Sequence, residues 1–234
     1  MLDFLGTVIT AALMVFVVAA LTAYLDISRG AKLTFAVLSG LWIGLAGAAS
    51  AAGWLAISKP FPVMGLFVAT PLIAAAIAAT SPAARAALLG LPTGLLVGLN
   101  IGRVFAVLFL LLGAEGRLGG PFPFFAGWGD IITGTLALPL LFVASDRRYS
   151  PLIFAWNLFG IADLVLAIFL GVTSADGSPL QIFFSPPGSA AMQQLPFSFV
   201  PAALVPFWLV LHAIVWAQLR ARTASREARA ASAL

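Results

Sequence analysis

Residues 89–114 read LGLPTGLLVGLNIGRVFAVLFLLLGA. This stretch is long enough for a helix that crosses the hydrocarbon core of a membrane, which takes about 20 predominantly apolar residues. It holds one charged residue, Arg103, well inside the apolar run. A charge at the centre of a bilayer costs about 2.5–3.5 kcal/mol on insertion scales, so such a residue normally faces the interior of a helical bundle. The stretch therefore predicts a membrane helix with a buried polar site.

The composition of the whole chain agrees with that stretch. Of its 234 residues, 62% are hydrophobic and 9% are charged, and the mean hydropathy is +1.10. A soluble domain has about 45–50% apolar and about 25% charged residues. These values exclude a water-soluble globular protein and a disordered chain. They predict an all-α, polytopic transmembrane bundle, which we expect in a membrane such as the bacterial cytoplasmic (inner) membrane.

The order of apolar and polar segments predicts about seven spans. They cover residues 5–25, 33–57, 61–80, 89–114, 126–144, 151–172 and 196–219, which form one transmembrane domain, 1–219, followed by a basic tail, 220–234. The first apolar run is too long for a signal peptide and follows no positive charge, so we expect it to be retained as a span.

The positive residues between the spans predict the orientation. One set of connections carries Arg29, Lys32, Arg85, Arg147, Arg148, Arg220, Arg222, Arg226 and Arg229, whereas the other carries only Lys59 and Arg117. The positive-inside rule then places the C-terminus in the cytoplasm and the N-terminus outside. The net charge of +4 is explained by this asymmetry, so no nucleic-acid partner is expected.

The basic tail has two interpretations. If the last helix continues, Arg222, Arg226 and Arg229 share one face, which suits anionic lipid headgroups at about 1 kcal/mol per arginine. A solvated tail is the alternative. The bundle itself is expected to contact lipid, and a homo- or hetero-oligomer stays open.

The few polar residues inside the spans predict two layers. They are Asn100, Arg103, Asp130, Asn157, Asp163 and His212. At about 1.5 Å per residue, Arg103, Asp130 and Asp163 lie about 21, 24 and 18 Å from the cytoplasmic edge. Asn157 and His212 both lie about 9 Å from it. We therefore expect an outer layer, with Asn100 beside Arg103, and a secondary inner layer.

The outer layer has one guanidinium and two carboxylates, so it carries a spare negative charge if all three groups are ionised. A proton on Asp163 or a bound cation would compensate that charge, as in an ion-linked carrier. Two alternatives compete with this interpretation. The three residues form a structural ion pair, or Asp130, in Gly127-Trp128-Gly129-Asp130, caps the fifth helix.

Residue counts limit the cofactors. Because the chain has no cysteine and one histidine, thiolate clusters and haem held by two histidines of one chain are excluded. A retinal Schiff base is disfavoured because Lys32 and Lys59 lie at segment ends. His212 is left to relay protons, to supply one axial haem ligand, or to stay neutral and hydrogen-bonded to a neighbour such as Asn157.

Small residues recur every four positions in two spans. They are Gly90, Gly94, Gly98 and Gly102 in one span, and Gly40, Gly44, Ala48 and Ala52 in the other. Spacing of this kind is typical of helix–helix seams in membranes. We expect these faces to pack within the bundle, against each other, with a homodimer seam as the alternative.

No nucleotide-binding, nucleophile or metal-ligand motif occurs, and Asp130 and Asp163 lack the motif of an intramembrane aspartyl protease. Three functions remain. The first is a small proton- or cation-linked carrier or channel whose site is Arg103, Asp130 and Asp163. The second is a non-catalytic subunit or scaffold of a larger assembly. The third is a membrane enzyme or cofactor-binding protein that uses His212.

Overall fold

The computed structural model describes residues 1–57 and 63–231, with side chains through residue 224. Every regular element in these ranges is a helix. In chain order they are α1 (Leu2–Tyr24), α2 (Arg29–Ala51), α3 (Val63–Ala78), α4 (Pro82–Leu89), α5 (Thr93–Gly98), the 3₁₀-helix η1 (Leu99–Ala106), α6 (Val107–Ala114), α7 (Phe122–Val143), the 3₁₀-helix η2 (Arg147–Tyr149), α8 (Ser150–Thr173), the 3₁₀-helix η3 (Ala190–Gln193), the π-helix η4 (Val200–Leu204) and α9 (Val205–Ala231).

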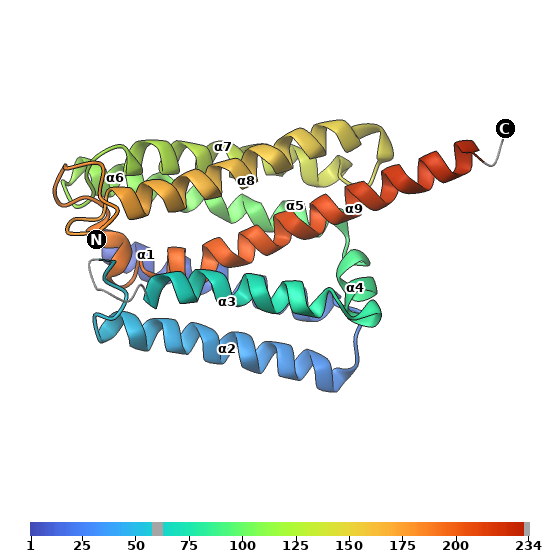
Figure 1. The fold of residues 1–234 in the computed structure, drawn as a ribbon, viewed down its shortest axis with the longest axis horizontal. Coiled ribbons are helices and arrows are strands. Elements are labelled where there is room, and N and C mark those ends of the chain that lie inside the picture. The colour runs from blue at the N-terminus through green and yellow to red at the C-terminus, as the bar shows by residue number, and fades with distance from the viewer. Residues whose placement is uncertain (58–62, 232–234) are drawn as a thin grey trace.

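The long helices lie roughly side by side (Figure 1). Within the described residues, six helical stretches are long and apolar enough to cross a membrane. The predicted span at 61–80 is the exception, because α3 has only 16 residues and the chain bends by 109° into α4. The membrane-protein class and the all-helical fold are thus supported.

The N-terminus and the loop that follows α8 lie at one end of the bundle, while α9 carries the chain past the other end (Figure 1). Arg117, after α6, pairs with Asp3 at 2.7 Å. This pair ties the α6–α7 turn to the end that holds the N-terminus.

The fraction of buried residues differs between the helices. In the most apolar part of α2, 22% of the residues are buried, against 61% in the last span, which joins η4 to α9. The main core contains buried residues of α1, α5, η1, α6, α7, α8, η4 and α9. A smaller cluster joins α2 and α3 to Ala202 of η4. The polar residues named above therefore lie on the helices that are most enclosed.

Two predicted boundaries are wrong for reasons of proline chemistry. The span expected from residue 89 begins at Thr93, because Pro92 cannot donate a backbone hydrogen bond to a continuing helix. The span expected from residue 126 begins at Phe122, because Pro123 in its first turn lacks an N–H that would have no partner there in any case.

The two small-residue faces do not pack against each other, so that prediction is wrong. A Cβ at Gly94 would lie 2.9 Å from the carbonyl oxygen of Leu141 in α7, whereas Gly102 contacts Leu13 of α1. Gly40 and Gly44 have no neighbouring atom within 4 Å of a Cβ position. The reason is that Leu141 of α7 and Leu13 of α1 already occupy the space beside Gly94, Gly98 and Gly102.

The loop between α8 and η4 is folded against the end of the bundle. Ser189 donates its hydroxyl hydrogen to the carbonyl of Gly171 at 2.6 Å, and the N–H of Gly119 donates to the carbonyl of Gly188 at 2.8 Å. Leu180, Ile182 and Phe184 remain exposed. The loop thus has buried polar anchors beneath an apolar outer surface.

The contrast between Gly94 and Gly40 gives a stability prediction. Gly94→Ala inserts a methyl group against a backbone carbonyl, so we expect a loss of about 1–3 kcal/mol in stability. Gly40→Ala meets open space and favours the helix by up to about 1 kcal/mol. The measurement is the thermal unfolding midpoint of each variant in detergent. Equal midpoints for the two variants would contradict the packing of α5 against α7.

Candidate functional site

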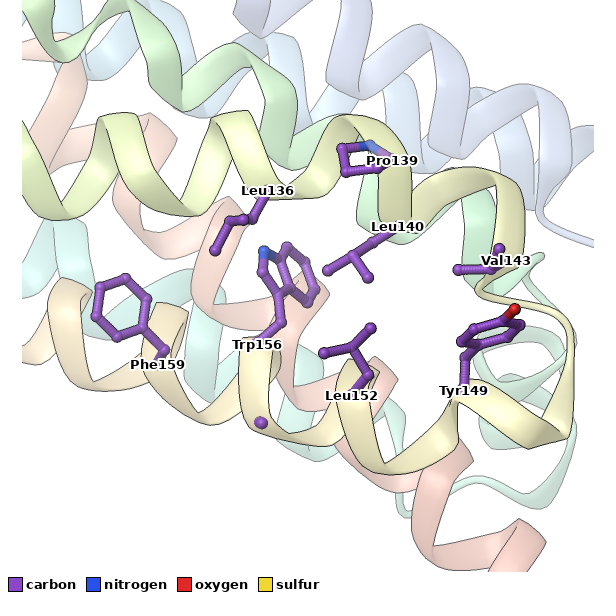
Figure 2. Close-up of a pocket in the computed structure, with 9 residues that line it drawn as sticks. Leu136, Pro139, Leu140, Val143, Tyr149, Leu152, Trp156 and Phe159 are labelled. Atoms are coloured by element: carbon purple, nitrogen blue, oxygen red, sulfur yellow. The ribbon is translucent and has the colours of Figure 1, made fainter.

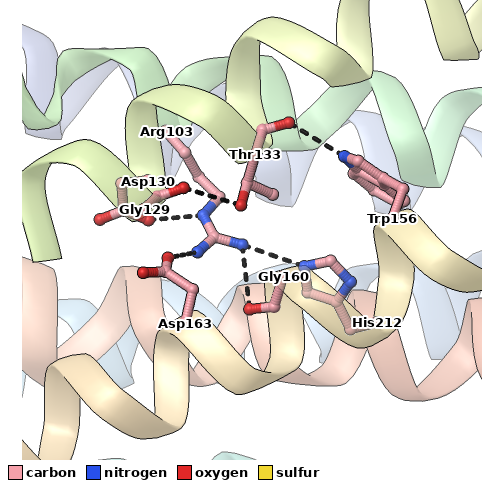
Figure 3. A network of polar contacts seen from close by, with 8 residues as sticks. All are labelled: Arg103, Gly129, Asp130, Thr133, Trp156, Gly160, Asp163 and His212. Carbon is pink, nitrogen blue, oxygen red and sulfur yellow. Dashed lines mark hydrogen bonds and ion pairs between the residues drawn. The ribbon is translucent and has the colours of Figure 1, made fainter. Parts of the chain in front are cut away.

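Arg103, in η1, is the centre of a buried polar network (Figure 3). Its side chain is completely buried. Nε donates to Oδ1 of Asp130 in α7 at 2.5 Å, and an Nη2 hydrogen is donated to Oδ2 of Asp163 in α8, also at 2.5 Å. The three residues expected in the outer layer are therefore brought together by three different helices.

The remaining guanidinium nitrogen extends the network toward α9. Nη1 lies 3.4 Å from the carbonyl oxygen of Gly160 and 3.1 Å from Nε2 of His212. The prediction of two separate layers is wrong, because His212 lies between Arg103 and Asn157. The depth estimate treats each residue as a point on a straight helix, whereas the arginine and histidine side chains both extend along the bundle.

The hydrogen-bond partners of His212 determine which of its ring nitrogens carries the hydrogen. Arginine has no acceptor, so Nε2 of His212 must accept the hydrogen of Nη1. Nδ1 then carries the ring hydrogen and donates it to Oδ1 of Asn157 at 2.8 Å. Asn157 in turn donates to the carbonyl of His212 at 3.2 Å. The ring is thus a neutral imidazole with both nitrogens engaged, and axial haem ligation would break one of these bonds.

Two glycines make room for the network, and sequence reasoning did not single out their roles. The carboxylate of Asp163 occupies the position that a Cβ on Gly129 would fill. The ring of His212 does the same at Gly160, where Nε2 would lie 2.6 Å from a Cβ. The recurrence of Gly-x-x-Asp at 127–130 and 160–163 was the available signal, although only Gly160 of that pattern borders the network.

Aromatic rings enclose the charged groups. Cζ of Arg103 lies 5.7 Å from the ring centroid of Trp208, and the ring of Trp156 lies 5.1 Å from that of His212. Trp156 also donates to the carbonyl of Thr133 at 3.0 Å. The interval of four residues between Trp208 and His212 places both on one helix face, which is the signal that identifies Trp208.

Asn100 lies beside the network without joining it. It precedes Arg103 by one turn of the 3₁₀-helix, so the two residues share a face, but its Nδ2 donates to the carbonyl of Leu96 at 2.9 Å. Its Oδ1 is buried without a hydrogen-bond partner in the described structure, as is Nε1 of Trp208. One buried acceptor and one buried donor next to the network therefore have no hydrogen-bond partner within the described residues.

Asp130 is not a helix cap, so that alternative is wrong. α7 begins at Phe122 after Pro121, which leaves Asp130 about two turns inside the helix. The reason is the early start of α7, which turns the predicted helix end into helix interior. Its carboxylate is therefore free to pair with Arg103.

The charges of the network do not balance. Arg103 contributes one positive charge, the two aspartates contribute two negative charges when ionised, and His212 is neutral. Each carboxylate uses one oxygen on Arg103, and its second oxygen makes no hydrogen bond within the described residues. Asp163 is 6% exposed and Asp130 3%, against 0% for Arg103. Asp163 is thus the most exposed of the three charged residues.

An apolar groove of about 490 Å³ lies beside the network, between α7 and α8 (Figure 2). Leu140 and Leu152 face each other across it, and Tyr149 stands near the α7–α8 turn (Figure 2). Trp156 lines the groove and also contacts His212. Because Arg103, Asp130 and Asp163 do not line it, the groove reaches the network only through this indole.

Within the described residues, no group of three or more histidine, cysteine, aspartate or glutamate side chains is arranged to hold a metal ion. The donors that the network offers are the free oxygens of Asp130 and Asp163, with Arg103 between them. Such a set can exchange a proton or pair with a small cation.

Removing the central charge tests the energetics of the network. Arg103→Gln leaves two buried carboxylates without their cation, which is expected to cost about 3–5 kcal/mol. Adding Asp130→Asn and Asp163→Asn to the same chain removes the uncompensated charges and should recover part of that loss. The matched control is Arg117→Gln, whose exposed pair with Asp3 is worth about 0.2–1 kcal/mol. Equal unfolding midpoints for R103Q and R117Q would refute the network's stabilising role.

The contacts at Gly160 and Gly171 predict different effects of alanine substitution on stability. Gly160→Ala should displace the ring of His212 and lower the unfolding midpoint, because a methyl group cannot share that volume. Gly171→Ala, in the same helix, meets only Phe122 at 3.5 Å and should be neutral. Thermal unfolding in detergent compares them, and a midpoint for G160A as high as that of G171A would be the contradicting result.

The comparisons with known proteins concern the part of the chain that holds the network. The family model described as a domain of unknown function (DUF8737) matches residues 60–220. No curated protein and no solved structure matches the chain. The match includes Arg103, Asp130, Asp163 and His212, whereas α1 and α2 precede it. Because it covers more than half of the sequence, the chain belongs to the DUF8737 family.

Proposed function

We propose that this chain is a small proton- or cation-linked membrane carrier or channel, and that Arg103, Asp130 and Asp163 form its binding site. The observation that supports the proposal is the buried excess of one carboxylate over the guanidinium. A buried charge without compensation is costly. A proton or a monovalent cation at the free oxygen of Asp163 removes that cost. Asp130 then remains as the permanent partner of Arg103.

The helices that supply the site have irregular turns. Arg103 lies in an eight-residue 3₁₀-helix inserted between α5 and α6, and the π-helix η4 directly precedes α9, which carries His212. Long 3₁₀ stretches and π-turns inside helices are often found at hinges and functional sites. These turns support a site whose helices change geometry as the occupancy of Asp163 changes.

The proposal includes a topology. We count the bent pair of α3 and α4 as a seventh span, with the N-terminus outside and the C-terminus in the cytoplasm of a bacterial inner membrane. The end of the bundle where α7 gives way to α8 carries Arg147 and Arg148, whereas the opposite end carries the pair of Arg117 and Asp3. Lys59, and the side chains of Arg226 and Arg229, lie outside the described residues.

A second candidate is a non-catalytic subunit or scaffold in which the network only locks the helices together. The observation that favours it is that the network is enclosed. Arg103 is completely buried, and Asp130 and Asp163 do not line the groove between α7 and α8. Under this interpretation, neutralising Asp163 changes stability alone.

Asp163→Asn separates the two candidates. The variant keeps the size of the side chain and leaves Arg103 and Asp130 as a neutral pair, so it should fold. We expect proton or cation flux into wild-type proteoliposomes to exceed that of empty liposomes and to fall to the empty-liposome rate in D163N. Entrapped pyranine reports proton entry under a potassium–valinomycin potential, and dyes for sodium and potassium report the cations.

The control is Asp176→Asn, which removes an exposed carboxylate from the loop after α8 and should leave the flux unchanged. Two results would overturn the proposal. One is a wild-type rate equal to that of empty liposomes for protons, sodium and potassium. The other is a D163N rate equal to that of the wild type.

A further inference from the structure

A second hollow, of about 410 Å³, lies where α5 and α9 meet the α7–α8 turn. Its polar lining consists of Thr93, Ser145, Arg147, Gln218 and Arg222. Thr93 and Gln218 are buried, whereas Ser145 and Arg147 are exposed at the rim. The hollow is therefore open to the outside and has a fixed polar floor.

Arg222 is held in place by the bundle instead of extending into a free tail. Its Nη2 donates to Oγ1 of Thr93 at 2.8 Å, and its Nη1 donates to the carbonyl of Ala144 at 3.3 Å. Thr93 is itself fixed by donating to Oε1 of Gln218 at 2.8 Å. A guanidinium has five N–H donors, and these two bonds leave three of them for a ligand.

The floor is rigid because Gln218 is also anchored. Its Nε2 donates to the carbonyls of Leu89 and Leu91, at 3.1 and 2.7 Å. These carbonyls belong to the break between α4 and α5, so the glutamine satisfies backbone groups that the break exposes. The ligand-facing arginine is thus positioned before any ligand arrives, which lowers the entropic cost of binding.

The hollow has an excess of positive charge. Arg147 and Arg222 line the same hollow, so their like charges repel each other, and neither forms a salt bridge within the described residues. The neighbouring carboxylate of Asp146 accepts a hydrogen bond from the backbone of Arg148 at 2.8 Å. The carbonyl of Ala144, at the end of α7, bears only a partial negative charge, so it does not neutralise Arg222.

We propose that this hollow binds a phosphate group, held between Arg147 and Arg222. Two guanidiniums supply the planar, multiple donors that phosphate oxygens accept best, and a phosphate removes the repulsion between them. The hollow lies at the end of α7, where the apolar span stops, which is the depth of lipid headgroups. The ligand is therefore an anionic phospholipid headgroup or a soluble phosphate. This inference stands independently of the Arg103 network.

The test compares Arg147→Gln with Arg148→Gln. Both remove one exposed arginine from the same turn, but only Arg147 lines the hollow, and its side chain makes no hydrogen bond that the substitution would break. The probes are inorganic phosphate and short-chain phosphatidylglycerol, titrated into the detergent-solubilised full chain at constant ionic strength. Short-chain phosphatidylcholine serves as the lipid control. The unfolding midpoint reports binding, because a ligand of the folded state raises it.

We expect at least one phosphate probe to raise the wild-type midpoint saturably. The R147Q variant should need at least about tenfold more probe, since a charge-assisted phosphate contact is lost, while R148Q stays within about twofold of the wild type. A response to phosphatidylglycerol at far lower concentration than to inorganic phosphate identifies a lipid headgroup, and the reverse order identifies a soluble phosphate. No saturable response, or equal weakening in R147Q and R148Q, would overturn the proposal.

Discussion

The buried guanidinium of Arg103 is the constraint on which the rest of the bundle depends. A charge removed from water is tolerated only where other groups replace its hydration. Arg103 obtains these groups from Asp130 of α7, from Asp163 and Gly160 of α8, and from His212 of α9. Because these contacts come from separate helices, no one of the helices can shift without exposing the charge. The polar network therefore sets the register of the four helices that it connects, η1, α7, α8 and α9.

The glycines follow from this constraint. Helices that share a small buried network must approach closely, and a Cβ at Gly129 or Gly160 would occupy the space of a network side chain. Close approach at Gly94 also brings α5 against the backbone of α7. By contrast, Gly40 and Gly44 of α2 meet no neighbour, and α2 lies outside the core that holds the network. Equal spacing in sequence therefore has different consequences on the two helices.

The sequence predicts the class of the fold and most of the network. Composition and apolar run length are sufficient to predict an all-helical membrane protein, because runs of about 20 apolar residues have the length of a spanning helix, in which every backbone hydrogen bond is made within the segment. Depth arithmetic brings Arg103, Asp130 and Asp163 together, since charges at one level need one another. It fails for His212, because the contact with Arg103 depends on how far the two side chains extend along the bundle. It also fails for Asn100, because its amide donates a hydrogen bond to the carbonyl of Leu96 one turn earlier. It also misses the 3₁₀ geometry of η1, which hydrophobic periodicity does not reveal.

The two arginine sites have opposite electrostatic imbalances, and this difference is why the two proposed ligands have opposite charges. Around Arg103, two carboxylates pair with one buried guanidinium, so the missing charge is positive. Around Arg222, Arg147 stands at the rim of the hollow. Within the described residues no carboxylate pairs with either arginine, so the missing charge is negative. The first imbalance lies deep among the helices, and the proton or small cation that we propose there would compensate it. The second lies in the open hollow at the end of α7, and the phosphate group that we propose there would compensate it.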